Sequence, residues 1–160
     1  MRLCAVAVVL VATCALAVPA QAGRTIPIQM SGTIVDSPTP DPSCGGLHNV
    51  STGTIAGSPF GRSGWFSTGC IDATAEPGVL TIRDATFVLT AQDGKVYGVY
   101  HAHASLPSSS GHIYAWGPFE LVKGTGRYKG VHGSGIAASD GNIAAANAQL
   151  TLSGSMSAPR

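Results

Sequence analysis

Short runs of alternating apolar and polar residues recur along the chain, separated by clusters of Gly, Pro, Asp and Ser. In the first run, residues 25–35, the side chains of Ile26, Ile28, Met30 and Ile34 fall on one face at a period of two, which is typical of a β-strand with one buried face. No stretch shows apolar residues sustained at helical spacing. The pattern therefore predicts an all-β protein.

Eight segments fit this description. We predict strands over residues 25–35, 48–57, 63–73, 80–91, 95–104, 112–122, 130–139 and 143–156. Gln92-Asp93-Gly94 and Asp140-Gly141-Asn142 carry the residue types of tight hairpin turns, so each is expected to join two neighbouring strands. Residues 36–42 are expected to form a loop, because their three prolines remove backbone hydrogen-bond donors.

Most connections between these segments are short and none has the length of a crossover helix, so consecutive strands should pair antiparallel. Eight such strands close comfortably into an up-and-down barrel, which has no exposed strand edge. The interior of such a barrel is either filled by side chains or left open for one small ligand. We therefore predict an eight-stranded antiparallel β-barrel, with a two-sheet β-sandwich as the alternative.

The first 22 residues resemble a secretory signal. Arg2 is followed by an apolar run over residues 3–18 and by Ala20-Gln21-Ala22, which is a small-x-small cleavage site. The run is shorter than the roughly 20 residues that a membrane-spanning helix needs. We predict a signal peptide over residues 1–22, a single barrel domain over residues 23–160, secretion or a periplasmic location, and no stable membrane insertion after cleavage.

Charge argues against two classes of partner. Removing Arg2 with the signal leaves equal numbers of basic and acidic residues, and no cluster of Lys or Arg remains. Nucleic-acid binding and attraction to a membrane surface both depend on such an excess of basic groups. We expect neither a nucleic acid nor a membrane surface as a partner.

Two of the four cysteines, Cys4 and Cys14, fall inside the predicted signal, which leaves Cys44 and Cys70 in the mature chain. An even pair in an exported protein predicts one disulfide, with two free thiols as the alternative. On the chain-entropy model, a disulfide that closes this loop stabilises the fold by roughly 3 to 4 kcal/mol.

The segment Lys123-Gly124-Thr125-Gly126-Arg127-Tyr128-Lys129-Gly130-Val131-His132-Gly133-Ser134-Gly135 contains the pattern Gly-Thr-Gly-Arg-aromatic-x-Gly followed by Gly-Ser-Gly. It resembles the late barrel segment of the allene oxide cyclase and dirigent-like superfamily, as found in small secreted bacterial proteins. The likeness extends backward through Phe119-Glu120-Leu121 and the Asp93-Gly94 hairpin, so it covers the C-terminal half of the chain. The resemblance implies an eight-stranded barrel and carries over no catalytic residue. The glycines of the segment favour a tight turn with the Tyr128 ring buried beneath it.

Four side chains are candidates for ligand binding. Tyr97, His101 and His103 alternate along one strand and therefore share a face, with the two histidines roughly 6 to 7 Å apart. The opposite face is the more apolar, so the simpler interpretation places the histidines outward in water, and a role inside the barrel is the alternative. Glu120, between Phe119 and Leu121, is expected either in the interior or outward in solvent.

Metal binding would need more than the histidine pair, because zinc takes a third or fourth ligand. The nearby candidates His112, Glu120 and His132 have no diagnostic spacing, so neither a metal nor another cofactor is expected. The sequence also contains no Gly-x-Ser-x-Gly motif. We predict a non-enzymatic exported barrel that either binds a small hydrophobic molecule or acts as a secreted accessory module. A cyclase- or isomerase-like enzyme and a cell-surface structural or interaction protein are the alternatives.

Overall fold

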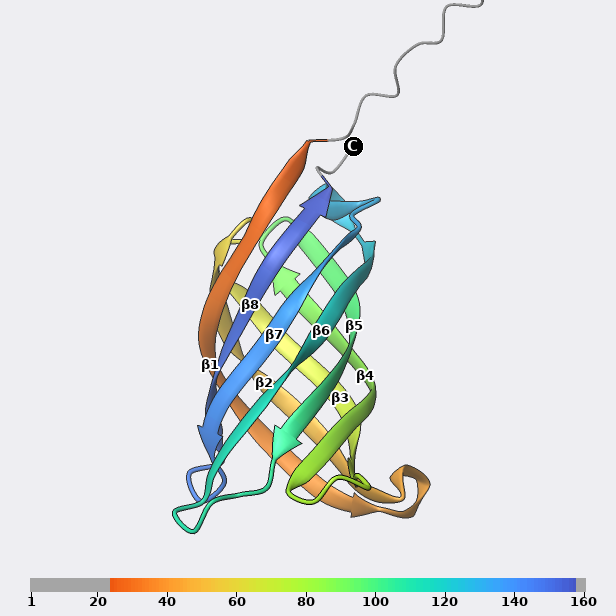
Figure 1. Ribbon diagram of the computed structural model, residues 1–160. Helices are drawn as coiled ribbons and strands as arrows, with labels where there is room; N and C mark the ends of the chain where they lie inside the picture. The colour runs from red at the N-terminus through yellow and green to blue at the C-terminus, as the bar shows by residue number, and fades with distance from the viewer. Residues whose placement is uncertain (1–23, 158–160) are drawn as a thin grey trace, which may run out of the picture.

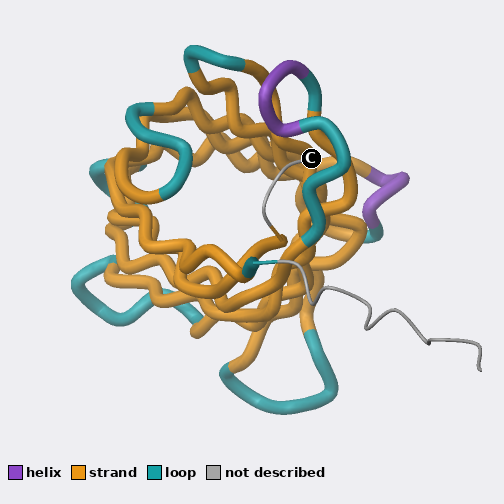
Figure 2. The backbone as a smooth tube through the Cα atoms, turned by 90° about the horizontal axis from the view of Figure 1, so that it is seen from above, coloured by secondary structure: helices purple, strands orange, loops and turns teal. Residues whose placement is uncertain are grey.

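The computed structural model describes residues 24–157, which form a closed antiparallel barrel (Figure 1). The strands are β1 (Thr25–Asp41), β2 (Gly46–Ser58), β3 (Ser63–Ala73), β4 (Val79–Ala91), β5 (Gly94–Ser105), β6 (His112–Gly124), β7 (Gly133–Asn142) and β8 (Asn147–Ser157). Each strand pairs with the next one along the chain, and β8 pairs with β1 to close the ring (Figure 2). The predicted eight-stranded up-and-down barrel is confirmed, and the sandwich alternative is wrong.

The predicted signal peptide, residues 1–22, lies outside the described residues. Two short 3-10 helices, η1 (Pro42–Cys44) and η2 (Gly126–Tyr128), lie in the connections after β1 and β6. Nowhere between residues 24 and 157 is there a helix long and apolar enough to cross a membrane.

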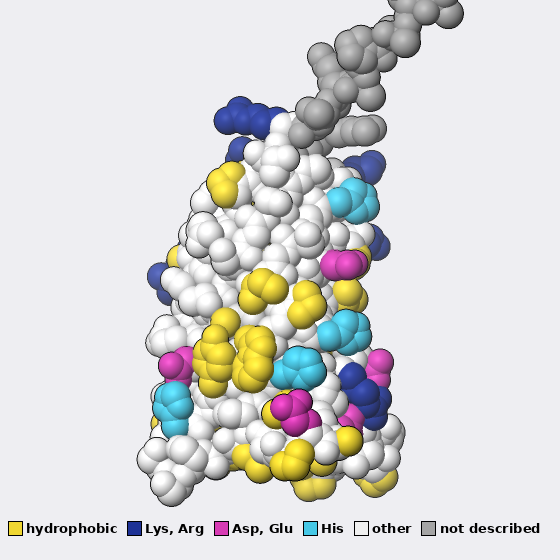
Figure 3. Space-filling model, in the orientation of Figure 1, with side chains coloured by type: hydrophobic (Ala, Val, Ile, Leu, Met, Phe, Trp, Pro, Cys, Tyr) yellow, Lys and Arg dark blue, Asp and Glu magenta, His cyan; other side chains and the backbone are white. Residues whose placement is uncertain are grey.

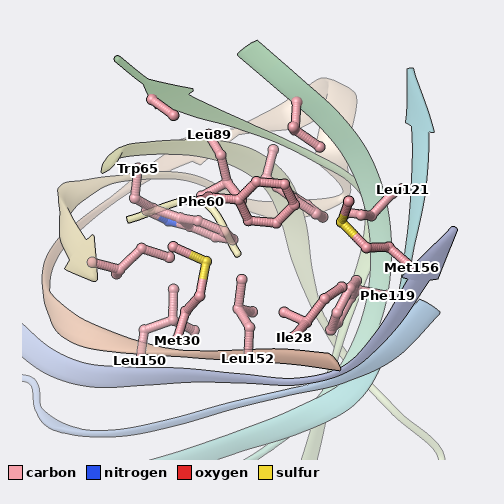
Figure 4. Packing of buried hydrophobic residues seen from close by; sticks show 14 of the residues in the cluster. Ile28, Met30, Phe60, Trp65, Leu89, Phe119, Leu121, Leu150, Leu152 and Met156 are labelled. Carbon is pink, nitrogen blue, oxygen red and sulfur yellow. The ribbon is translucent and has the colours of Figure 1, made fainter. Parts of the chain in front are cut away.

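One end of the barrel is filled with side chains. This end carries the connections 59–62, 92–93 and 125–132, and three residues of these connections, Phe60, Tyr128 and Val131, are buried. The rings of Phe60 and Tyr128 meet edge to face with their centroids 5.1 Å apart, so the predicted burial of Tyr128 is confirmed. Beneath them pack Ile28, Met30, Leu89, Val96, Leu121 and Met156 (Figure 4).

The proline-rich segment after residue 35 differs from the prediction. It is not a loop: β1 continues to Asp41, and its ladder with β2 runs from Asp36 opposite Ser51 to Asp41 opposite Gly46. Pairing of β1 with β8 ends at Val35, so the rest of β1 has a neighbouring strand on one side. A strand edge of this kind tolerates proline, because one row of backbone donors needs no partner.

The two predicted hairpins have different outcomes. β4 ends at Ala91 and β5 begins at Gly94, whose φ of 149° suits glycine, so the first hairpin is confirmed. The second turn is wrong by several residues, since residues 140–142 belong to β7 and the chain turns at residues 143–146. The Asn142 side chain explains the shift, because its Oδ1 accepts a hydrogen bond from the Ala144 N–H at 2.9 Å and so caps the later turn.

The predicted disulfide is present. Cys44 in η1 is bonded to Cys70 in β3, with a Cα–Cα distance of 5.2 Å. The guanidinium of Arg83 on β4 also donates to the Cys44 carbonyl oxygen at 2.6 Å and to Asp72. The disulfide and these hydrogen bonds hold the β1–β2 connection against β3 and β4, at the end of the barrel opposite the filled one.

Candidate functional site

The interior of the other end holds a cavity of about 220 Å³. Its walls come from the second half of β1 and the first half of β2, and from the corresponding ends of the other strands (Figure 1). This is the end that carries the connections 42–45, 74–78, 106–111 and 143–146. The barrel is therefore a cup with one filled end and one hollow end.

Three aromatic rings form the floor of the cup. The rings of Trp65 and Phe87 are stacked with centroids 5.0 Å apart, and Phe119 meets Phe87 edge to face at 6.1 Å. All three are buried and all three line the cavity. Gly98 makes this layer possible, because a Cβ on that residue would come within 2.2 Å of the Phe87 ring. The floor separates the cavity from the filled half of the barrel.

The side walls above this floor are mostly apolar. Small side chains on β5 and β6, such as Ala102, Ala104 and Ala115, leave space that larger residues would fill. The remaining apolar lining is Ile34, Pro38, Ile71, Leu80, Ile82, Ile113, Trp116, Ala137, Ala138, Ile143, Ala146, Ala148, Leu150 and Leu152. A wall of this composition favours an apolar ligand, because burial removes apolar surface from water on both sides.

A polar row crosses one wall. The strand register places Asp36 of β1 opposite Ser51 of β2, and Ser51 opposite Ser67 of β3, so three polar side chains stand next to one another. All three line the cavity, together with Asn49, which lies two residues from Ser51 on the same face. One side of the cup can therefore form hydrogen bonds.

Hydrogen bonds fix most of this row. The Asn49 amide donates to Asp36 Oδ1 at 2.9 Å, and the Trp65 indole N–H donates to Ser51 Oγ at 3.3 Å. The hydroxyls of Ser67 and Tyr100 lie 3.4 Å apart. The exception is Asn49 Oδ1, which is shielded from solvent and has no hydrogen-bond partner among residues 24–157. The row thus holds one buried acceptor without a donor.

Tyr100 reaches the polar row from β5, on the far side of the ring of strands from β1. Burial raises the pKa of its hydroxyl above the ordinary value, because the phenolate would lose its water. The hydrogen bond with Ser67 acts in the opposite direction, and the negative charge of Asp36 raises this pKa further. The negative charge of Asp36 therefore acts on the Tyr100 hydroxyl.

None of the four residues predicted to bind a ligand lines the cavity. His101 and His103 are exposed while their neighbours Ala102 and Ala104 line the interior, so the simpler interpretation of outward histidines is confirmed. Tyr97 lies on the same outer face, with the Lys123 ammonium 5.9 Å from its ring centroid. Glu120 is exposed on β6 between the inward Phe119 and Leu121. The expectation that any of these side chains faces the interior is corrected, since strand alternation turns all four outward.

The described residues contain no group of three His, Cys, Asp or Glu side chains that could hold a metal ion. His112 has an acidic neighbour, since its Nε2 lies 2.6 Å from Asp140 Oδ1, and both side chains are more than half exposed.

The outer face of β6 and β7 also carries exposed apolar side chains. Tyr114 and Trp116 are about 40% exposed and stack with ring centroids 5.4 Å apart, and Ile136 on β7 is exposed nearby. Figure 3 shows hydrophobic side chains gathered beside histidines on the face that Figure 1 presents. The cell-surface interaction alternative would use such a face, and it stays a prediction.

Comparisons of the chain with models of known families, with curated proteins and with solved structures find no match. The site is therefore defined by its geometry. Asp36, Asn49, Ser51 and Ser67 were not among the site residues predicted from the sequence, and Tyr100 was predicted only to fill or line the interior. The signal for Asp36 was present, because it continues the inward series of β1 two residues after Ile34.

Proposed function

We propose that the hollow end of the barrel binds one small, mainly apolar molecule. The observation that carries this proposal is the cavity of about 220 Å³, which lies between a buried aromatic floor and the outer opening of the barrel. At the filled end, three residues of the connections are buried. At the hollow end, Cys44, which is disulfide-bonded, is the one buried connection residue in the described part of the chain. A ligand would supply the apolar contacts that these walls lack.

The volume limits the size of the ligand. Apolar cavities of about 150 Å³ are known to take up benzene, and pockets for drug-sized molecules begin at about 300 Å³. At about 220 Å³ the cavity lies between these values, which suits a molecule with one ring and a short substituent. Long-chain lipids would extend beyond the opening.

The proposal is for binding without chemistry. The cyclase- or isomerase-like alternative, which rests on the resemblance to allene oxide cyclases, stays a prediction. So do export, the secreted or periplasmic location and the absence of nucleic-acid and membrane partners.

Toluene is a suitable first probe, because it is neutral and of the right size. Trp65 is in the cavity floor, and Trp116, which also lines the cavity, is 40% exposed. A Trp116→Phe background keeps an aromatic ring at that position and leaves Trp65 as the one indole that reports on the cavity. Toluene should change the Trp65 emission in a saturable way and raise the melting temperature, because a ligand that binds the folded state stabilises it.

A pair of matched variants tests the location. Ala115→Phe places a phenyl ring in the cavity and should abolish toluene binding, since a benzene-sized group takes up most of the volume. Ala56→Phe makes the same change at an exposed position on β2 and should leave binding unchanged. Equal toluene binding by both variants, or no saturable binding by the parent protein, would overturn the proposed function.

A further inference from the structure

The charge that lines the cavity is negative. Among the described residues that line it, Asp36 is the one with an ionisable carboxyl group, and no Lys, Arg or His is present. Phenols such as Tyr100 are neutral at ordinary pH. A charged ligand therefore meets one carboxylate and no cation.

Asp36 also lacks a cationic partner of its own. None of the four ion pairs formed within residues 24–157 includes it, and its side chain accepts a hydrogen bond from the neutral Asn49 amide. The unpartnered Asn49 Oδ1 adds a second uncompensated acceptor beside the carboxylate. A carboxylate has about four lone-pair sites, so Asp36 keeps the capacity to accept further hydrogen bonds.

The position of Asp36 sets the direction in which a ligand would lie. Along β1 the inward residues run from Ile34, through Asp36, to Pro38 near the end of the strand. The strand register sets Trp65 of the aromatic floor opposite Gly53, and Gly53 opposite Ile34, which is one inward position deeper than Asp36. An apolar ring on the floor would therefore leave its substituent at the height of the Asp36 carboxylate.

From these observations we propose that the ligand is a small apolar amine, bound as its ammonium cation with the N–H groups donating to Asp36, and that the cavity rejects carboxylates of the same size. This inference rests on the proposed function. An ammonium group offers three donors to a wall that holds the Asp36 carboxylate and the unpartnered Asn49 Oδ1, whereas a carboxylate would meet a like charge. Hydrogen bonds between charged groups are also the stronger kind.

Three probes with one phenyl ring separate the charge states: 2-phenylethylamine, 2-phenylethanol and phenylacetate. Binding is measured by calorimetry and by Trp65 emission in the Trp116→Phe background at neutral pH. The amine should bind about tenfold or more tighter than the alcohol, which is the scale of one charge-assisted hydrogen bond. Phenylacetate should bind more weakly than the alcohol.

Asp36→Asn keeps the shape of the side chain and removes its charge. It should bring the affinity for the amine to within a few fold of that for the alcohol, and leave alcohol binding close to that of the parent protein. Asp36→Glu should retain a preference for the amine. Asp93→Asn is the matched control, because Asp93 pairs with Arg127 at the filled end and its charge is remote from the cavity.

The outcomes distinguish this inference from the proposed function. Equal affinity for the three probes, tighter binding of phenylacetate, or an amine preference that survives in Asp36→Asn would overturn the amine assignment. Binding of toluene without binding of the amine would also overturn it, while the proposed function would stand. Failure of toluene and of all three probes to bind would remove both.

Discussion

Replacing Phe87 by alanine removes the central ring of the cavity floor. Phe87 is 1% exposed and contacts the rings of Trp65 and Phe119 with centroid distances of 5.0 and 6.1 Å. Its loss would deepen the cavity by the space of the ring, because Gly98 on the adjacent strand has no side chain to fill that space. The change therefore affects both the stability of the barrel and the depth of the cup.

The expected cost follows from these contacts. Phe→Ala substitutions at buried sites cost about 3–5 kcal/mol, and each aromatic pair contributes about 0.5–1.5 kcal/mol beyond the area it buries. The new space opens onto an existing cavity that water can reach, which reduces the penalty for an empty void. We expect a loss of about 3 kcal/mol, a large share of the roughly 5–15 kcal/mol that stabilises a typical domain.

Urea unfolding monitored by circular dichroism measures this loss. Phe66→Ala is the matched control, because Phe66 lies on the neighbouring strand β3, faces outward and is 47% exposed, and its replacement should cost less than about 1 kcal/mol. Toluene should also stabilise Phe87→Ala more than the parent protein, since the deeper cavity offers more apolar contact.

Two results would refute this reasoning. If Phe87→Ala and Phe66→Ala lowered the free energy of unfolding by the same small amount, the Phe87 ring would not be part of a packed floor. If toluene stabilised Phe87→Ala less than the parent protein, the lost ring would be a wall that the ligand needs and not a boundary beneath it.

Two further predictions concern the Cys44–Cys70 disulfide and the pKa of Tyr100. Removing the Cys44–Cys70 disulfide, by reduction or by a double alanine substitution, should lower the free energy of unfolding by about 3.5 kcal/mol, because the bond closes a loop with a separation of 26 residues; an unchanged urea midpoint would contradict this. The pKa of Tyr100 is raised in the fold, so its contribution to stability is present below its ordinary value of 10.0 and is lost as the pH rises through the folded pKa. Ultraviolet titration of the phenols should show the pKa of Tyr100 falling in Asp36→Asn, and an unchanged titration would count against the proximity of the Asp36 charge.

The barrel could be predicted because alternation is a local property of each strand. In β5, for example, every second residue from Val96 to Ala104 except Tyr100 is small or apolar, and the structure turns this series inward. The bounds predicted for residues 63–73 coincide with those of β3. The prediction failed where the structure of a segment depends on a distant strand. Residues 36–42 were predicted to be a loop, but Pro38 is tolerated in β1 because the pairing of β1 with β8 ends at Val35.

The cavity could not be predicted from the same pattern. Whether an inward residue is packed or faces a cavity depends on what the connections contribute, and Phe60 and Tyr128 fill one end from loops that alternation does not describe. A signal was present in residue size, because the inward positions of β5 and β6 near the hollow end are Ala102, Ala104 and Ala115. Small inward residues at one end of a barrel indicate a cavity only when the strand register is known.

The barrel is hollow at one end and filled at the other. Diffraction from a crystal of the protein under xenon pressure tests it directly, because xenon enters apolar cavities and gives strong density. We predict a xenon site among Ile34, Phe87 and Leu150, and none among the packed side chains near Ile28 and Met156. A crystal with no xenon in the interior, or with xenon at the filled end, would contradict the account.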